Sequence, residues 1–184
     1  MSRMFSILSG LGALTLAPQL ANGQGGAMAT PADGHTIHVT APHVVAGTAM
    51  GPYHHYCKVL APDPVIECLV YGSSDLNARL EQVEYIIAKS ITRTGAVSLQ
   101  NWNQNWHDHQ QEIATGRVQV LDLPPDKAKE VADLVATTDG IIFHLWSHGA
   151  EVPSGHVIIA QSVGHVSLTE AQLKHGALAK ATKQ

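Results

Sequence analysis

Two stretches of strand-like residues, 53–60 and 65–71, stand on either side of a short segment that contains two prolines. This arrangement predicts a β-hairpin, because proline favours turns and the flanking runs are rich in aromatic and β-branched residues. A four-residue loop at 61–64 fixes a register with three facing pairs: Leu60 with Val65, Lys58 with Glu67, and Cys57 with Cys68. One register thus pairs both the opposite charges and the two cysteines, which supports it.

Within such a strand, successive side chains point to opposite faces of the sheet. We therefore expect His55 and Cys57 on one face of the first strand, and His54 and Tyr56 on the other. The hairpin brings one histidine of the adjacent pair to each face.

Residues 78–88 fit two patterns after a turn at 72–77. Leu80, Val83 and Ile87 have helical spacing, whereas Val83, Tyr85 and Ile87 alternate as in a strand. The Tyr-Ile-Ile sequence favours the strand, because aromatic and β-branched residues suit a pleated sheet. We expect a strand here.

The second half of the chain predicts further helices and strands. A short helix is expected at 97–105 and a strand at 117–121. Pro124 and Pro125 open the next helix, with Asp122 as its expected cap. The buried stripe of this helix is expected to be Ala128, Val131, Ala132 and Val135. Two paired strands at 141–146 and 156–161 follow, and then a C-terminal helix with a capping box of Ser167 and Glu170.

Strands and helices thus follow one another without regular βαβ alternation, which predicts the α+β class with a mainly antiparallel sheet and a few flanking helices. A chain of 184 residues suits one domain. We place that domain at residues 36–166, followed by a C-terminal helix or tail at 167–184.

The N-terminus has the features of an export signal. Arg3 precedes an uncharged apolar run, 4–17, and small residues at Ala21 and Gly23 favour cleavage before Gln24. The run of about fourteen residues is short of the roughly 20 that span a bilayer, which favours cleavage over a membrane anchor. We therefore expect a signal peptide at 1–23, a disordered leader at 24–35, a periplasmic or secreted protein, and no membrane span after cleavage.

The charge of the chain excludes one class of function. Only 14% of residues are charged and the net charge is -4. A nucleic-acid partner is not expected, because such proteins need a basic face to neutralise phosphates.

Histidines and acidic residues gather at two places and indicate a metal site. If residues 106–110 are extended, His107 and His109 project to one side; if they are helical, His109 and Glu112 make the useful pair. Two imidazoles and a carboxylate suit a divalent transition metal such as Zn²⁺, Fe²⁺ or Cu²⁺. His54 or His55 would add a ligand from the hairpin, and Glu84 is either a ligand or an acceptor for an imidazole N–H.

The alternative to a metal site is that these histidines only hydrogen-bond within the fold. Other histidines are expected on the surface or in loops: His35, His38, His43, His156, His165 and His175. Trp102, Trp106 and Trp146 are expected in the core rather than in a ligand pocket. Nucleophilic catalysis has little support, since neither a Gly-x-Ser-x-Gly elbow nor a glycine-rich phosphate loop occurs.

Cys57 and Cys68 have three interpretations. The first is a cross-strand disulfide, which an oxidising compartment would preserve. The second is a pair of free, buried thiols. The third is thiolate ligation beside the histidines, which a disulfide would exclude.

Several motifs occur in one order at similar spacing. They are His54-His55-Tyr56-Cys57, Glu-Cys-Leu-Val-Tyr at 67–71, Asn-Ala-Arg-Leu at 77–80, Val-Glu-Tyr-Ile-Ile at 83–87, Trp106-His107-Asp108-His109, and Glu112-Ile113 with Gly116. Together, from about residue 38 to 162, they resemble the oil-body-associated protein family, whose plant, fungal and bacterial members share a domain of unknown function. The resemblance implies association with lipid droplets in the plant members and no established catalytic mechanism.

The apparent export signal makes this chain resemble an exported, bacterial member of that family. We expect a noncatalytic protein that binds a small ligand or a metal ion. A metal-dependent enzyme is one alternative, and a protein associated with a lipid surface is another.

Overall fold

The computed structural model describes residues 30–147 and 149–178, with the side chains of the last helix described as far as residue 174. The expected signal peptide, its cleavage position before Gln24 and most of the expected leader lie outside these residues. The end of that leader is described, and there Pro31–Gly34 forms a short 3-10 helix, η1, in place of the structureless chain we expected.

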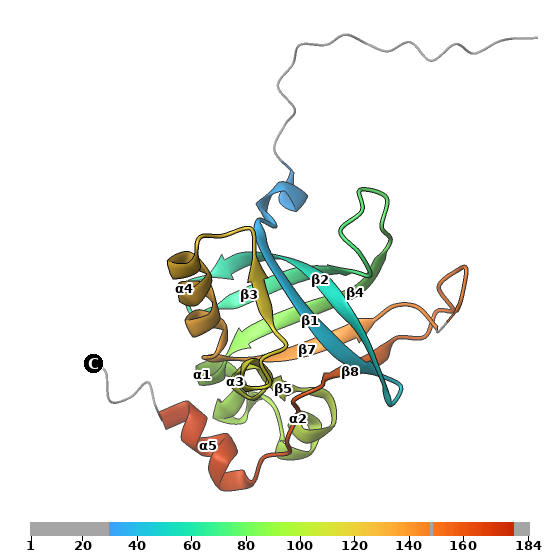
Figure 1. Cartoon of the computed structure of the whole chain (residues 1–184). Helices are drawn as coiled ribbons and strands as arrows, with labels where there is room; N and C mark the ends of the chain where they lie inside the picture. Colours follow the sequence, from blue (N-terminus) through green and yellow to red (C-terminus); the bar gives the residue numbers. More distant parts are fainter. Residues whose placement is uncertain (1–29, 148, 179–184) are drawn as a thin grey trace, which may run out of the picture.

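In the described part of the chain, six strands form a sheet that closes on itself (Figure 1). Their order around the ring is β1 (Ile37–Val45), β2 (Thr48–Ala61), β3 (Val65–Tyr71), β4 (Leu80–Ala88), β7 (Thr138–His144) and β8 (Ile158–Ser162). Every neighbouring pair is antiparallel, and β8 pairs with β1 to complete the ring. The expected antiparallel sheet is confirmed, and its closure as a small barrel gives the strands a shared interior.

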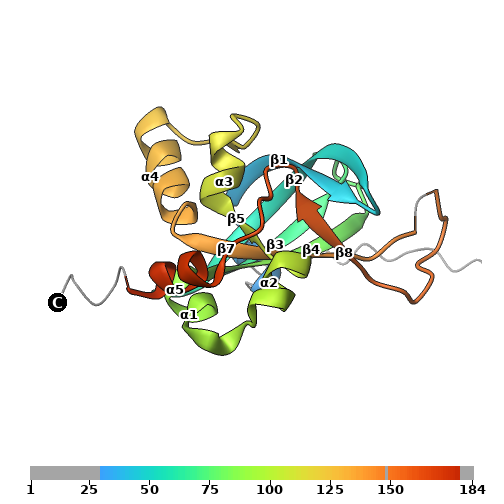
Figure 2. The same ribbon diagram turned by 90° about the horizontal axis from the view of Figure 1, so that it is seen from below.

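Two very short strands pair with members of the closed sheet, and helices pack against this sheet. The strand β6 (Gln119–Leu121) pairs with β1, and β5 (His107–Asp108) pairs with β7. The helical segments are α1 (Lys89–Ile91), the π-helical turn η2 (Thr92–Ala96), α2 (Leu99–Asn105), α3 (His109–Ala114), α4 (Pro125–Val135) and α5 (Glu170–Leu178). Figure 2 shows α3 beside α4, while α1, α2 and α5 gather in a second group.

The hairpin of β2 and β3 has the register expected from the sequence. Cys57 faces Cys68 and forms a disulfide with it, and Lys58 faces Glu67. The expected pairing of Leu60 with Val65 is wrong, because the register shifts after Val59 and places Ala61 opposite Val65. A bulge of this kind adds one residue to a strand near its turn, which the loop length alone does not predict.

Other expected elements are confirmed, with corrections at their ends. Residues 80–88 form a strand and 99–105 a helix. Asp122 does not cap α4, whose N-cap is Pro124. The carboxylate of Asp122 lies 2.6 Å from Nδ1 of His38 instead. The capping box of α5 is made by Thr169 and Gln172 rather than by Ser167 and Glu170. The expected stripe of α4 is only half-buried, because the helix covers the sheet from one side.

Apolar residues pack both inside the ring and outside it. One interior group consists of Tyr53, Cys57, Ile66, Cys68, Val70 and Ile86. Outside the ring, Trp102 and Trp106 pack with residues of α5 and the segment before it, so these two tryptophans are core residues as expected. Trp146 is half-buried under the guanidinium of Arg79. Among the described helices, none combines the length and the apolar character needed to cross a membrane.

Candidate metal centre

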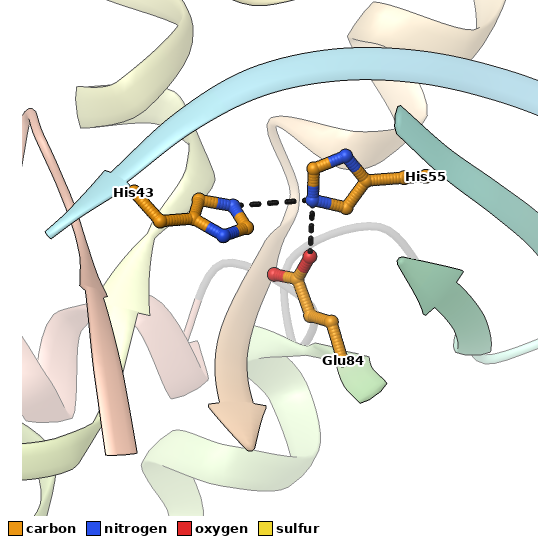
Figure 3. Close-up of side chains that lie close together, drawn as sticks. All are labelled: His43, His55 and Glu84. Carbon is orange, nitrogen blue, oxygen red and sulfur yellow. Dashed lines mark hydrogen bonds and ion pairs between the residues drawn. The ribbon is translucent and has the colours of Figure 1, made fainter. Parts of the chain in front are cut away.

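The carboxylate of Glu84 lies inside the closed sheet at the centre of a group of imidazoles. Strand alternation places it there, because Gln82, Glu84 and Ile86 share the inward face of β4. By the same alternation β2 turns His55 inward and β1 turns His43 inward. Figure 3 shows these two rings above the Glu84 carboxylate.

Two more histidines reach Glu84 from β5 and α3, where β5 pairs with β7. His107 belongs to β5, and His109 is the first residue of α3, so the chain turns from strand to helix between them. Helical geometry then brings Glu112, three residues after His109, to the same side. The five side chains around Glu84 are all at most 5% exposed: His43, His55, His107, His109 and Glu112.

The Nε2 atoms of these rings converge on the two oxygens of Glu84. Oε1 lies 3.2 Å from Nε2 of His107 and 3.2 Å from Nε2 of His109. Oε2 lies 3.3 Å from Nε2 of His55, which is itself 3.1 Å from Nε2 of His43. The carboxylate of Glu112 is farther away, with Oε2 3.9 Å from Nε2 of both His107 and His109.

The opposite nitrogens of three rings are held by acceptors. Nδ1 of His55 lies 3.3 Å from the carbonyl oxygen of Val39 and therefore donates to it. Nδ1 of His109 lies 3.0 Å from the hydroxyl of Thr138. That hydroxyl donates its only proton to the Val135 carbonyl at 2.6 Å, so it must accept from His109.

His43 is oriented by a chain of side-chain amide contacts. Its Nδ1 lies 2.6 Å from Oε1 of Gln82, whose Nε2 lies 3.0 Å from Nδ1 of His144. An amide nitrogen only donates and an amide oxygen only accepts, so Nδ1 of His43 carries the proton. Nε2 is thus the nitrogen that His55 and His109 turn toward Glu84 and that His43 turns toward His55. Imidazoles that bind metals are held in this way, with the remote N–H on an acceptor.

His107 is the exception, because neither of its ring nitrogens has a hydrogen-bond partner within the described part of the chain. Its Nε2 is close to Glu84, but the carboxylate oxygen does not lie along the N–H direction. Among the described residues, Oε1 of Glu112 is also buried and unpartnered. Buried polar atoms without partners are rare in proteins, and a bound ion is one explanation for them.

The charges at the site follow from this arrangement. Burial would raise the pKa of the Glu84 carboxyl, but its contacts with His107, His109 and His55 outweigh burial and hold that pKa well below its ordinary value. Burial lowers the pKa of His43 to about 3, and the neighbouring His55 adds to the effect. Burial also opposes charge on His109, but Glu84 and then Glu112 outweigh it and raise the pKa of this ring. Glu84 is therefore an anion and His43 a neutral base near neutral pH.

A buried ionic network fixes the segment that carries His107 and His109. Asp108, between them, lies 2.6 Å from Nζ of Lys89 and 2.8 Å from Nη2 of Arg93, and it caps α3 by accepting from the backbone N–H of Gln110. Arg93 also binds both oxygens of Asp139, which faces Asp108 across the β5–β7 pair. The network leaves the two imidazoles little freedom to move away from Glu84.

A small apolar cavity reaches the site from beneath α4. Its polar end is formed by His55, Glu84, His109 and Glu112. Its walls are apolar and come from β1 to β4, from α4 and from Val118, the residue before β6; they include Val39, Ile86, Val131 and Leu134. The free space is about 40 Å³, enough for roughly three water molecules.

Of the site residues expected from the sequence, the structure brings together His55, His107, His109, Glu112 and Glu84. It leaves His54 on the outer face of β2, where Nδ1 lies 2.9 Å from Nε2 of His38. Of the adjacent pair, His55 is thus the member that points inward, and it shares that face with Cys57, as the strand alternation predicts. The disulfide excludes Cys57 and Cys68 as thiolate ligands.

Two histidines expected on the surface are buried, so that expectation is wrong for them: His38 is 7% exposed and His43 is 1% exposed. His35 and His165 are half-buried, His156 is exposed, and the side chain of His175 lies outside the described residues. The sequence reasoning missed His43 as a site residue. A signal for it exists, since Ile37, Val39, Ala41, His43 and Val45 alternate along one strand and His43 is the polar member of that face.

Comparison with known proteins identifies relatives but no mechanism. A family model described as "Protein of unknown function (DUF1264)" matches residues 29–182. Oil body-associated protein 1B of Arabidopsis thaliana is 29% identical over 133 residues, which cover 71% of this chain and 52% of the relative. Oil body-associated protein 2A of Zea mays is 32% identical over 104 residues, which cover 55% of this chain and 40% of the relative. The chain thus spans about half or less of these relatives, and no solved structure matches it.

Proposed function

The chain belongs to the DUF1264 family, which includes the oil body-associated proteins, and within this family we propose that it binds a divalent transition-metal ion in its buried centre. The first ligands are Glu84, His107 and His109, and Glu112 is the nearest further carboxylate. The proposed role of the chain is to bind this ion, or a small ligand that the ion holds.

The spacing of the ligand atoms is the observation that carries this proposal. Four ligands placed at ~2.05 Å around a tetrahedral ion lie about 3.3 Å from one another. The Nε2 atoms of His107 and His109 each lie 3.2 Å from Oε1 of Glu84. A charge-assisted hydrogen bond between a buried imidazolium and a carboxylate is shorter, at roughly 2.7–2.9 Å. The distances therefore fit the edge of a coordination shell better than they fit a direct ion pair.

The donor atoms decide the class of ion. Imidazole nitrogens with one or two carboxylate oxygens suit Zn²⁺, Fe²⁺ or Cu²⁺. Ca²⁺ and Mg²⁺ prefer shells made of oxygen alone, so the imidazoles disfavour them. The contact of Nδ1–H of His109 with Thr138 supports the same class, because it directs Nε2 toward Glu84, where the ion would lie.

Elemental analysis of the chain purified without a histidine tag tests the proposal. We expect stoichiometric zinc, iron or copper in the unaltered chain, and its loss in His107→Ala and in His109→Ala. His156→Ala is the matched control, because this exposed histidine lies outside the site and its removal leaves the metal content unchanged. Circular dichroism checks that each variant folds. A folded, metal-free chain that takes up no ion on dialysis against Zn²⁺ would overturn the proposal.

A metal-dependent enzyme is the second candidate, and the apolar cavity favours it. This cavity ends at Glu84, His109 and Glu112, where a small molecule could reach a bound ion. Adding azide to the Co²⁺-substituted protein tests access to an open coordination position. A change in the visible absorption of Co²⁺ would support the enzyme, and an unchanged spectrum would favour the noncatalytic role.

We also propose that the chain is located in the periplasm or outside the cell. The disulfide of Cys57 and Cys68 supports it, because such bonds persist in oxidising compartments. Cell fractionation with mass spectrometry of the N-terminus tests it, and a mature chain beginning at Gln24 is the expected result.

A further inference from the structure

Glu84 presents its two oxygens to two different pairs of imidazoles. Oε1 faces His107 and His109, whereas Oε2 faces His55, whose Nε2 is in contact with that of His43. Two groups of potential ligands, His43–His55–Glu84 and Glu84–His107–His109, therefore share one carboxylate. One ion at Oε1 would use only the second group.

Hydrogen bonding accounts for the first group only if His55 carries a proton on both of its ring nitrogens. His43 and His55 both direct Nδ1–H at acceptors, namely Gln82 Oε1 and the Val39 carbonyl. When both rings are neutral, their Nε2 lone pairs face each other at 3.1 Å, and one of them also faces Oε2 of Glu84 at 3.3 Å. Three electron-rich atoms directed at one another in a buried place repel, unless a positive charge lies between them.

The distances in this group repeat those of the other group. Separations of 3.1 and 3.3 Å again match the roughly 3.3 Å that separates ligands of one tetrahedral ion. The two imidazoles come from β1 and β2, which are neighbouring strands of the closed sheet. The contact between them and the contact of His55 with Glu84 therefore do not depend on a flexible loop. His43 also has Gln82 and His144 behind it, which hold its Nδ1 in place as supporting residues do in metal sites.

We propose that the centre holds two metal ions, bridged by Glu84, with His107, His109 and Glu112 on one ion and His43 and His55 on the other. This inference rests on the proposed metal-binding function and adds a second ion to it. In proteins with two-ion sites, a carboxylate commonly joins ions that lie roughly 3.5–4 Å apart. The alternative is one ion, with His55 protonated at both nitrogens and donating from Nε2 to Glu84 and His43.

Metal stoichiometry separates these arrangements. The untagged chain is stripped with a chelator, loaded with Cu²⁺, desalted and analysed for copper per chain. We expect two ions in the unaltered chain, one in His43→Ala and two in His54→Ala. The last variant is the matched control, because His54 lies on the same strand as His55 but contacts His38 instead of Glu84.

Electron paramagnetic resonance of the same samples gives an independent readout. Two Cu²⁺ ions that share Glu84 couple magnetically, so the unaltered chain shows a broadened or weakened signal. His43→Ala leaves an isolated ion with a full, resolved signal.

One copper per unaltered chain, with an uncoupled signal, would overturn the second ion and leave the proposed function standing. The absence of bound copper would overturn both. Because the unaltered chain decides the stoichiometry, failure of His43→Ala to fold does not remove the test.

Discussion

Gly140 faces His107 across the β5–β7 pair, and its missing side chain makes room for the imidazole. A Cβ at this position would lie 2.6 Å from Nε2 of His107 and 2.6 Å from Oε1 of Glu84. Real Cβ atoms do not approach so closely, so glycine is required for two ligand atoms of the proposed centre to occupy this place.

Gly140→Ala therefore tests the centre without removing a ligand. We expect the alanine to displace His107 and Glu84, to lower metal content by at least half, and to cost about 1–3 kcal/mol of unfolding free energy through overpacking. Urea denaturation and elemental analysis measure the two effects. Gly34→Ala is the control, since its Cβ would meet only the flexible Lys58 side chain. Full metal content in Gly140→Ala would contradict the role given to this glycine.

Chelation should lower the stability of the folded chain. An ion that binds only the native state adds RT ln(1 + [L]/Kd), about 2.7 kcal/mol at a free-ion concentration 100 times Kd. We expect the urea midpoint to fall when a chelator removes the ion and to recover on adding Zn²⁺. The midpoint of His107→Ala should respond to neither treatment. Equal midpoints for the unaltered chain in both conditions would show that no ion contributes to the fold.

The metal-free chain should lose stability as the pH falls below about 6.5, and His43 is one cause. Its pKa is about 3 when folded, below its ordinary value of 6.5, so between these values the unfolded chain binds a proton that the folded chain does not. Each pH unit in this window costs up to about 1.4 kcal/mol. His43→Ala should flatten this part of the curve of unfolding free energy against pH. Parallel curves for the two proteins would exclude His43 as the titrating group.

The disulfide should contribute measurably to stability. It links Cys57 to Cys68 across 11 positions, and closing a loop of this size restricts the unfolded chain by about 2–3 kcal/mol. We expect the double variant Cys57→Ala/Cys68→Ala to lose this amount in urea denaturation. Mass spectrometry without reduction gives the direct check: two free thiols in oxidised protein would show that the bond does not form.

The hairpin could be predicted because its signals are local. The turn at 61–64, the charge pair and the cysteine pair lie within about twenty residues, and alternation then placed His55 beside Cys57. The same reasoning could not decide which face of β2 becomes the interior, because that depends on closure of the sheet by strands far along the chain. For this reason the sequence alone does not distinguish His54 from His55 as a candidate ligand.

His43 shows more clearly where prediction of the site from the sequence fails. It lies on β1 among apolar neighbours, and its contact with His55 exists because β1 pairs with β2. The central position of Glu84 is not predicted either, since its own segment indicates only that it is a ligand or an acceptor for an imidazole N–H. Pairings over long sequence separations create this centre, and no spacing rule describes them.

The ligand atoms of the centre come from β1, β2, β4, β5 and α3, between positions 43 and 112 of the chain. An unfolded chain cannot present them together, so the sheet must close before an ion finds its complete set of ligands. In the proposed centre, folding would therefore precede binding of the ion, whereas in a zinc finger the metal organises the chain. On this proposal, the metals available in the compartment where the chain folds would decide which ion it binds.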